Sequence, residues 1–381
     1  MKKIRLGLVN TNYVKIGPYT KKGTEIFDYL FIQNLAKRYG KEINATAFCT
    51  GDSILPIKKE SVSYHSSTED KNIGEQKQVL FEISLISKAF GMSNKFDIYH
   101  VNLGNGEYVL PFTRFIKKPI VITMHGSTDE KYTSKYYSLY KDQKNIHFVS
   151  ISDMQKKNTY FNKSRTIYHG IDTSNKFLFN EKGGNNIIWT GRAIPEKGLD
   201  EVMMVSKRMK IPTKAFPIIK NEYFNWLYTE VLEKRDIINQ LDRVRIDFNV
   251  IRSKLVVEYQ NSKVFLFPVK WEEPFGFTVI ESMACGTPVV AYSRGSLPEL
   301  VKDGVTGFLV NPSEDDIRGN FLIKKTGIDG LCEAVARIYA MKPAEYEAMR
   351  KACRTHAEEK FNVNRMVDEY VSLYREILSK K

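Results

Sequence analysis

The chain has 381 residues, of which 42% are hydrophobic and 27% charged, a composition that excludes a disordered protein and predicts soluble globular domains. At this length two domains are expected, each large enough to bury its own hydrophobic core. The formal net charge is +14, and residues 1–175 carry +10 of it, with 26 Lys and Arg against 16 Asp and Glu.

The basic first half indicates which partners to expect. Basic surfaces attract phosphates, anionic lipids or nucleic acids, although dispersed surface lysines explain the same excess without any partner. The sequence has no RNA-binding aromatic motif, zinc finger or long run of Lys and Arg, so no nucleic-acid partner is expected. Weak peripheral association with anionic membranes is expected instead.

The opening residues and the cysteines favour a cytoplasmic protein. The first apolar run stops at Asn10, which is too short for a signal peptide or a membrane span, and it predicts a strand. Cys49, Cys285, Cys332 and Cys353 are scattered and form no C-x-x-C pair, so neither a zinc site nor a disulfide framework is predicted. We therefore expect a reducing compartment, with any membrane contact at the inner face of the membrane.

Short β-branched segments alternate with amphipathic segments through the first half of the chain. Gly40 and Gly91 follow two of the amphipathic segments, where a left-handed helix cap is expected. The alternation predicts a parallel, doubly wound α/β domain over residues 1–178. Its strands are predicted at 4–10, 43–49, 97–102, 119–126, 146–152 and 166–170, and its helices include 24–39 and 75–90.

A second series of the same kind predicts a second domain over residues 184–362. The polar segment 173–186, with Gly183 and Gly184, is expected to be the linker between the domains. An amphipathic helix at about 363–381 is expected to pack on either domain, including back on the first. Strands of the second domain are predicted at 187–191, 213–219, 243–249, 263–269 and 288–292.

Two doubly wound, Rossmann-like domains in tandem are expected to face each other across a cleft. Ligands of such parallel sheets bind at the carboxyl ends of the strands. The motifs that carry chemistry should therefore lie in loops that directly follow strands.

The strongest motif follows the strand predicted at 263–269. Pro274 and Gly276 mark a tight loop, and Thr278 is the expected cap of the helix that comes next. A strand, a glycine-containing loop and a helix start form an anion site, because the helix dipole and free backbone N–H groups point at the ligand. Glu281 lies about one turn into the helix, where a carboxylate can bind both hydroxyls of a ribose, and Glu273 precedes the turn. A β–α junction without a ligand is the alternative.

A second motif follows the strand at 187–191. Arg192 and Lys197 lie five residues apart across a loop that ends in Gly198 at a helix start. Two such cations can bracket a diphosphate, Arg with its planar fork and Lys as a point charge. A surface Arg and a surface Lys with no shared ligand are the alternative.

These segments resemble the family 4 glycosyltransferases of glycosyl transferases group 1, which have the GT-B fold. The resemblance rests on two glutamates in the arrangement E-PFGFTVI-E, on the downstream run ACGTPVVAYSRGSLPELVKDGVTGFLV, and on G-R-x-x-x-x-K-G. It implies an N-terminal acceptor domain, a C-terminal donor domain, and transfer of a sugar from a nucleoside-diphosphate sugar with retention of configuration.

The resemblance also implies roles for individual residues of the second domain. Glu281 binds the donor ribose, and Glu273 lies close to the transferred sugar. Arg192 and Lys197 neutralise the donor phosphates and the leaving nucleotide. The diphosphate is bound by the backbone amides of the loop and helix start, namely those of Gly276, Phe277 and Thr278.

In the first domain the resemblance is less sharp. The family has a glycine-rich loop after the first strand, and Gly17 and Gly23 are the candidates here, although Lys21-Lys22 replace the usual paired glycines. Helix capping is the alternative role of Gly23. His125, at the end of the strand TMHGS, matches a family position where a histidine approaches the donor sugar, and a structural histidine is the alternative.

The sequence therefore predicts a nucleotide-sugar-dependent glycosyltransferase. No Asp-x-Asp motif is present, so neither a metal nor another cofactor is expected, and fixed cations replace the metal. A sugar-nucleotide epimerase and a non-catalytic nucleotide-sugar-binding protein remain the alternatives. Segments 50–95 and 205–250 match nothing specific, so the acceptor, whether glycan, lipid-linked or small molecule, stays open.

Overall fold

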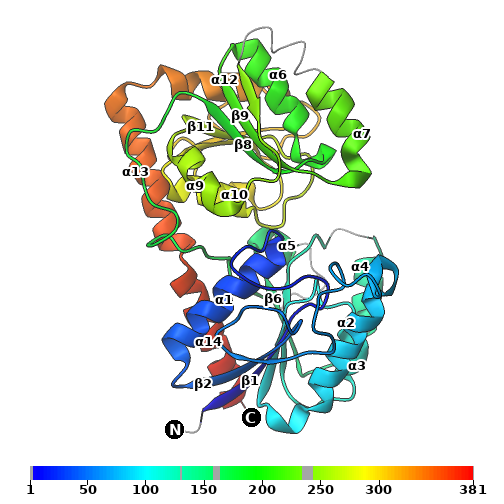
Figure 1. Cartoon of the computed structure of the whole chain (residues 1–381). Helices are drawn as coiled ribbons and strands as arrows, with labels where there is room; N and C mark the ends of the chain where they lie inside the picture. The colour runs from blue at the N-terminus through cyan, green and yellow to red at the C-terminus, as the bar shows by residue number, and fades with distance from the viewer. Residues whose placement is uncertain (1–2, 129–130, 158–163, 234–242, 381) are drawn as a thin grey trace. The chain divides into compact units, whose positions relative to one another are not determined.

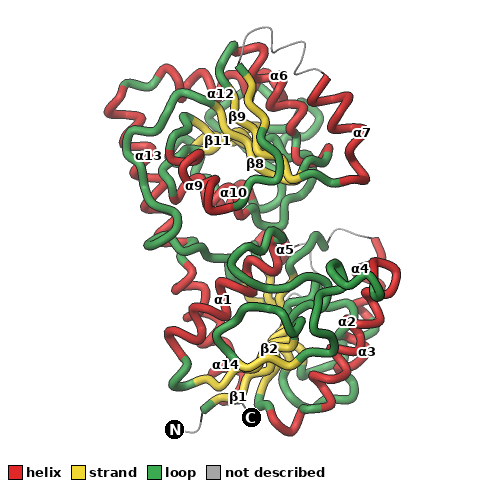
Figure 2. The backbone as a smooth tube through the Cα atoms, viewed as in Figure 1, coloured by secondary structure: helices red, strands yellow, loops and turns green. Residues whose placement is uncertain are grey.

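The computed structural model describes residues 3–128, 131–157, 164–233 and 243–380. The chain divides into two compact units (Figures 1 and 2). Unit 1 comprises Met1–Gly170 and Val363–Lys381, and unit 2 comprises Ile171–Asn362. No helix within the described residues is both long enough and apolar enough to cross a membrane.

Unit 1 is built on a seven-stranded parallel sheet with the strand order β3-β2-β1-β4-β5-β6-β7. Its central strands are buried on both faces, as expected for a parallel sheet covered by helices on both sides. In chain order, the strands are β1 Ile4–Val9, β2 Ile43–Phe48, β3 Lys58–Glu60, β4 Ile98–Val101, β5 Ile120–Met124, β6 Ile146–Ser150 and β7 Arg165–Thr166.

Helices lie on both sides of this sheet, with α1 and α14 on one side and α2 and α3 on the other (Figure 1). The C-terminal helix α14 belongs to unit 1: Asp368 pairs with Arg38 of α1 at 2.7 Å, and the Tyr374 hydroxyl lies 2.6 Å from His100 Nδ1 of β4. The helical elements are α1 Gly23–Tyr39, α2 Gly74–Gly91, η1 Ser93–Lys95, α3 Leu110–Thr113, α4 Lys131–Ser138, α5 Asp153–Lys157 and α14 Val363–Ser379.

Unit 2 has a six-stranded parallel sheet with the order β10-β9-β8-β11-β12-β13. The order turns back at β8, and β11 lies directly beside it, with Phe265 in register with Ile188. Its strands are β8 Ile187–Arg192, β9 Thr213–Ile218, β10 Val244–Ile246, β11 Val264–Phe267, β12 Val289–Tyr292 and β13 Gly307–Val310.

The helices of unit 2 also form two groups. Helix α10 contacts α9 and α13, whereas α6 contacts α12 and the π-helical turn η4. The helical elements are η2 Pro195–Lys197, α6 Leu199–Met209, η3 Asn221–Tyr223, α7 Phe224–Leu227, η4 Tyr228–Leu232, α9 Arg252–Gln260, α10 Phe277–Ala284, α11 Leu297–Leu300, α12 Gly327–Ala340 and α13 Pro343–Lys360.

Three local expectations were wrong. Gly40 caps α1 in the right-handed region, with φ −61°, and Gly91 is still part of α2. Thr278 does not cap α10: it is the second residue of that helix, and Gly276, with φ 99°, occupies the cap position. Glycine adopts this φ without the steric cost that a Cβ would add.

Segment 173–186 packs on unit 2, so it is not a free linker. The Asn180 amide donates to the Cys285 carbonyl at 3.2 Å. A Cβ on Gly184 would lie 1.9 Å from the Asn261 carbonyl oxygen, and one on Gly183 would lie 2.6 Å from the Arg350 guanidinium. These glycines therefore allow close packing. A glycine-rich composition is typical of closely packed segments and of flexible linkers alike, so the sequence does not distinguish the two.

A buried arginine explains how this segment is held. Arg350 of α13 is 0% exposed and donates to the Asn180 carbonyl at 2.8 Å, the Gln260 carbonyl at 3.1 Å and the Cys285 carbonyl at 3.2 Å. Gln260 ends α9 and Cys285 follows α10, so the cation lies where the carbonyl ends of two helices carry partial negative charge. One turn on, Arg354 donates to the Ala284 carbonyl at 2.8 Å.

Candidate functional site

The site begins where β11 ends and α10 starts. Strand β11 ends at Phe267, the loop turns at Gly276, and α10 begins at Phe277. The first amides of a helix have no carbonyl partner within the helix, so Phe277 and Thr278 present N–H groups and the positive end of the dipole at this point. The strand, the glycine turn and the helix start expected from the sequence are therefore present, and anion binding at this point stays a prediction.

The loop before α10 is fixed by a second turn. Gly295 has φ 57°, and a Cβ there would lie 2.3 Å from the backbone of Glu273, so only glycine fits against the loop. Ser296 donates its amide to the Glu273 carbonyl at 2.9 Å and its hydroxyl to the Phe275 carbonyl at 2.5 Å. The turn thus sets the backbone that carries Glu273.

Lys197 and Glu273, predicted from separate motifs, form a buried ion pair. Lys197 is 8% exposed and Glu273 is 7% exposed, and the Lys197 ammonium donates to Glu273 Oε2. Lys197 ends the turn η2, and Gly198, with φ 69°, is the N-cap of α6 directly after it. Burial lowers the pKa of Lys197, although the neighbouring Glu273 carboxylate opposes this effect.

Trp271 joins this pair and was not predicted from the sequence. Its indole N–H donates to Glu273 Oε2 at 2.7 Å. The Lys197 ammonium lies 4.9 Å from the centre of the Trp271 ring, and the exposed Arg192 guanidinium lies 5.3 Å from it. Arg192, Lys197 and Glu273 therefore gather around one aromatic side chain, which a motif of charged residues does not reveal.

Glu281 also carries a buried ion pair. It is 2% exposed, and Arg252 of α9 pairs with its Oε1 at 2.6 Å. The Tyr259 hydroxyl lies 3.5 Å from Glu281 Oε2 and 2.7 Å from the Thr190 hydroxyl. Burial raises the pKa of Glu281, and Arg252 opposes that shift. Arg252 was missed because nothing in the sequence relates it to a glutamate 29 residues later.

In unit 1, His125 directly follows β5. Its amide donates to the Gly104 carbonyl at 3.0 Å, and its ring stacks on His169 at 5.3 Å and meets Phe27 edge-on at 4.9 Å. Its Nε2 lies 3.4 Å from Asn102 Oδ1. Burial lowers the pKa of His125 to about 3, so the imidazole is neutral at physiological pH.

Gly23 is the first residue of α1 and has no positive φ. Lys22 takes the extended cap position before it, and the Lys22 ammonium lies 3.6 Å from the centre of the Tyr13 ring. Gly17 lies earlier in the same loop, where its amide donates to the Thr20 hydroxyl at 3.2 Å. The loop therefore carries a cation over an aromatic ring beside the predicted glycines.

Buried carboxyl groups at the same end of unit 1 were also missed. Glu82 of α2 accepts from the Asn12 amide at 2.9 Å and from the Thr11 hydroxyl at 2.5 Å, and burial raises its pKa to about 7. Burial, and then the neighbouring Glu25, hold the pKa of Asp28 well above its usual value. A sequence signal existed, since Glu82 interrupts the apolar run VLFEISLI.

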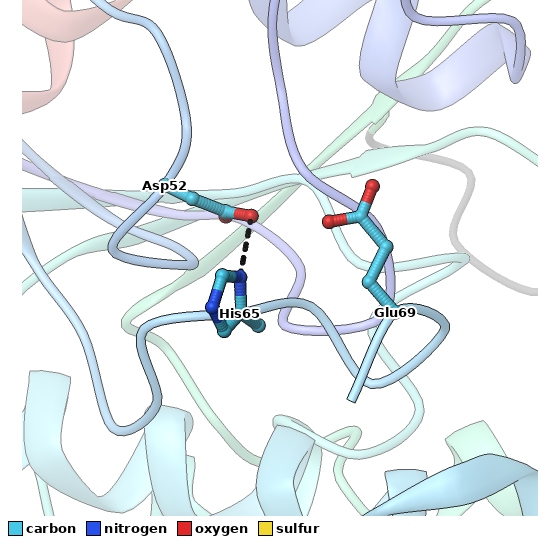
Figure 3. Close-up of side chains that lie close together, drawn as sticks. All are labelled: Asp52, His65 and Glu69. Carbon is cyan, nitrogen blue, oxygen red and sulfur yellow. Dashed lines mark ion pairs between the residues drawn. The ribbon is translucent and has the colours of Figure 1, made fainter. Parts of the chain in front are cut away.

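One group of side chains in unit 1 could bind a cation. Asp52, His65 and Glu69 each present a ligand-type atom, all within 4.8 Å of one another (Figure 3). His65 Nδ1 lies 3.5 Å from Asp52 Oδ2, while Glu69 already pairs with Lys15 at 3.7 Å. His65 and Glu69 are exposed, and Lys15 competes with any cation for the Glu69 carboxylate.

Known sequences resemble part of the chain. The profile of the Glycosyl transferases group 1 family matches residues 170–319. An uncharacterized 41.2 kDa protein in the cps region of Klebsiella pneumoniae is 28% identical over 193 residues, which is 50% of this chain and 46% of that protein. The D-inositol 3-phosphate glycosyltransferase of Thermobifida fusca is 37% identical over 97 residues, 26% of this chain and 21% of that enzyme. The chain thus spans less than half the length of these relatives.

Solved structures resemble the whole chain at low sequence identity. Sucrose-phosphate synthase from Thermosynechococcus elongatus has a TM-score of 0.74 at 18% identity and covers 100% of both chains. Anabaena HepE, solved in complex with UDP and glucose, has a TM-score of 0.70 at 15% identity and covers 98% of this chain and 99% of that one. The expected fold class, two parallel-sheet α/β domains of the GT-B type, is confirmed.

Proposed function

We propose that this protein transfers a sugar from a nucleoside-diphosphate sugar to an acceptor, with retention of anomeric configuration. The observation that carries the proposal is the buried Lys197–Glu273 pair beside the start of α10, within the domain that matches glycosyl transferases group 1. The retention of configuration rests on the resemblance of the E-PFGFTVI-E segment to family 4 enzymes.

In this proposal unit 2 binds the donor through charge. The N-terminal amides of α10, Arg192 and Lys197 stabilise the negative charge that grows on the departing nucleoside diphosphate. Glu273 lies near the sugar and stabilises the positive charge that develops on its ring. Glu281 binds the ribose hydroxyls while Arg252 holds its carboxylate in place.

The donor class has independent support. HepE, with the same fold, was solved with UDP-glucose, which is consistent with a nucleotide sugar as donor here. His125 is uncharged at neutral pH, so its role toward the donor sugar is that of a hydrogen-bonding group. The two fixed cations do the work of a metal, and we propose that no cofactor is needed.

Two rival functions use the same donor site. A sugar-nucleotide epimerase would convert the donor to an isomeric nucleotide sugar without any acceptor. A binding protein would hold nucleoside diphosphate tightly without turnover. Both rivals predict the same binding behaviour, so they are separated from transfer by following the fate of the sugar.

A thermal-shift screen of nucleoside diphosphates and nucleotide sugars tests the binding step. A ligand at 100 times its dissociation constant should stabilise the protein by about 2.7 kcal/mol. The stabilisation should be lost in Lys197→Met and kept in Lys207→Met, a matched control on the exposed side of α6. The hit is then incubated with an acceptor panel and its products identified. If no nucleotide stabilises the protein, the proposal is wrong.

A further inference from the structure

We propose that Trp271 is a positioning residue, which keeps Glu273 in place when Lys197 turns from Glu273 to the donor diphosphate. The inference starts from one atom. Glu273 Oε2 accepts from both the Lys197 ammonium and the Trp271 indole N–H, the latter at 2.7 Å. The carboxylate thus has one charged and one neutral donor.

The two donors respond differently to an anion. A diphosphate competes with Glu273 for the Lys197 ammonium, because both anions attract the positively charged ammonium. The indole carries no net charge, so a diphosphate attracts it less strongly than it attracts the ammonium. The indole N–H is therefore expected to stay hydrogen-bonded to Glu273. If Lys197 were the sole donor, its movement would leave a buried carboxylate without a partner, at a large desolvation cost.

The neighbouring residues fix the loop that carries Trp271 and Glu273. On one side Lys270 pairs with Asp200 of α6 at 2.6 Å. On the other, Glu272 pairs with Arg318 at 2.6 Å and accepts from the Gly295 amide at 2.6 Å. Lys270 and Glu272 are therefore held by ion pairs to other segments of unit 2. The side chains of the alternate residues, Trp271 and Glu273, are hydrogen-bonded to each other.

The Trp271 ring adds a second role. Arg192 and Lys197 lie 5.3 and 4.9 Å from its centre, within the range of cation–π attraction. The ring offers Lys197 a contact that does not depend on Glu273. The same side chain thus holds the carboxylate through its edge and both cations through its face.

Two double-mutant cycles test the first role in the absence of turnover. The melting temperature is measured for Trp271→Phe, Glu273→Ala and the double variant, and likewise for Lys197→Met with Glu273→Ala, because alanine removes the acceptor of both contacts; each variant is measured with and without saturating UDP or GDP. Without nucleotide both pairs should be non-additive. With nucleotide the Lys197–Glu273 coupling should shrink while the Trp271–Glu273 coupling persists. Additive behaviour of Trp271 and Glu273 in both states would overturn the inference.

Kinetics separate the two roles, and this step rests on the proposed transferase function. Trp271→Phe keeps an aromatic ring but loses the indole N–H. We therefore expect kcat to fall about tenfold while donor affinity changes less than twofold. Trp271→Leu loses the ring as well and should also weaken donor binding. Trp226→Phe, a partly buried tryptophan of the same unit, is the control. A Trp271→Phe enzyme with normal kcat contradicts the inference. If the wild-type protein binds no nucleotide, the proposed function is wrong. In that case the double-mutant cycle without nucleotide still tests the contact between Trp271 and Glu273.

Discussion

The two units surround their buried carboxyl groups with different partners. In unit 2 the carboxylates are paired with cations, Glu273 with Lys197 and Glu281 with Arg252. In unit 1 burial dominates, and the pKa values of Asp28 and Glu82 are raised. Burial raises the pKa of Glu281 as well, but there the Arg252 cation opposes the shift, whereas hydrogen bonds oppose the pKa shifts of Asp28 and Glu82.

This difference suits two kinds of ligand. A diphosphate is bound best by fixed charges and oriented N–H groups in a low-dielectric site. Hydroxyl groups are bound by neutral donors and acceptors, which cost less to bury than charges. The proposed function places the donor site in unit 2 and the acceptor site in unit 1, and each of the following changes tests one side of that proposal.

The largest effect is expected from Glu273→Gln. The amide retains an acceptor for Trp271 but has no charge, so it cannot stabilise a positive sugar ring in the transition state. We expect kcat to fall by about 100-fold or more, which is the scale for losing one preorganised electrostatic contact. Donor affinity, measured by calorimetry, should stay the same or rise because Lys197 is released. Glu314→Gln, on an exposed loop, is the control.

A Glu273→Gln enzyme with near-normal kcat but poor donor binding would contradict this role. It would place Glu273 with the binding residues and leave the sugar charge to another group. In that case the paired charges of unit 2 would serve affinity alone.

Glu281→Ala should act on donor binding. Losing hydrogen bonds from the ribose to a charged group weakens the donor complex by roughly 1.5–3 kcal/mol, and kcat should change less than donor affinity. The variant also leaves the partly buried Arg252 without its carboxylate, which lowers stability. Glu281→Ala combined with Arg252→Ala separates the two effects. Equal donor affinity in wild type and Glu281→Ala would contradict the ribose assignment.

Local sequence patterns predicted the parts of the site that depend on local geometry. The β–α alternation gave the order of most strands, and the glycines at 198 and 276 marked two turns with positive φ. Strand β3 was not predicted because its residues, Lys58–Glu60, lack any strand-like side chain. The resemblance covered Lys197 and Glu273 separately, but only the folded chain pairs them.

Contacts between distant segments could not be predicted in this way. Arg252 and Arg350 act through partners on other elements, and nothing in their local sequence names those partners. Gly183 and Gly184 show the same limit, since their composition predicted a linker but their small size serves close packing. A single sequence shows the periodicity of apolar residues and the residues that form turns. It does not show which segments pack against each other in the folded protein.

A smaller effect is expected from Glu82→Gln, which tests the neutral side of the comparison. Burial raises the folded pKa of Glu82 to about 7, above its unfolded value. The folded protein thus keeps a proton that the unfolded chain releases, so stability falls as pH rises from about 4.3 toward 7. Gln cannot ionise, so the variant should melt about 2–4 °C above wild type at pH 8, with the difference shrinking at pH 5.

The control for this prediction is Glu359→Gln, an exposed residue of α13. Its melting temperature should follow wild type at both pH values. If Glu82→Gln instead melts below wild type at pH 8, the ionised carboxylate stabilises the Thr11–Asn12 loop, and the contrast between the units is wrong at this position.

The smallest effect is expected from metal removal. If Arg192 and Lys197 supply the positive charge that the departing diphosphate needs, transfer in EDTA should equal transfer in magnesium or manganese. Activity that is lost in EDTA and restored by either ion would show that the cations of unit 2 are insufficient. The trio Asp52, His65 and Glu69 offers an internal comparison (Figure 3). A metal bound there would change the melting temperature in EDTA, and the change would disappear in His65→Ala, whereas a metal bound with the donor would affect transfer in both proteins alike.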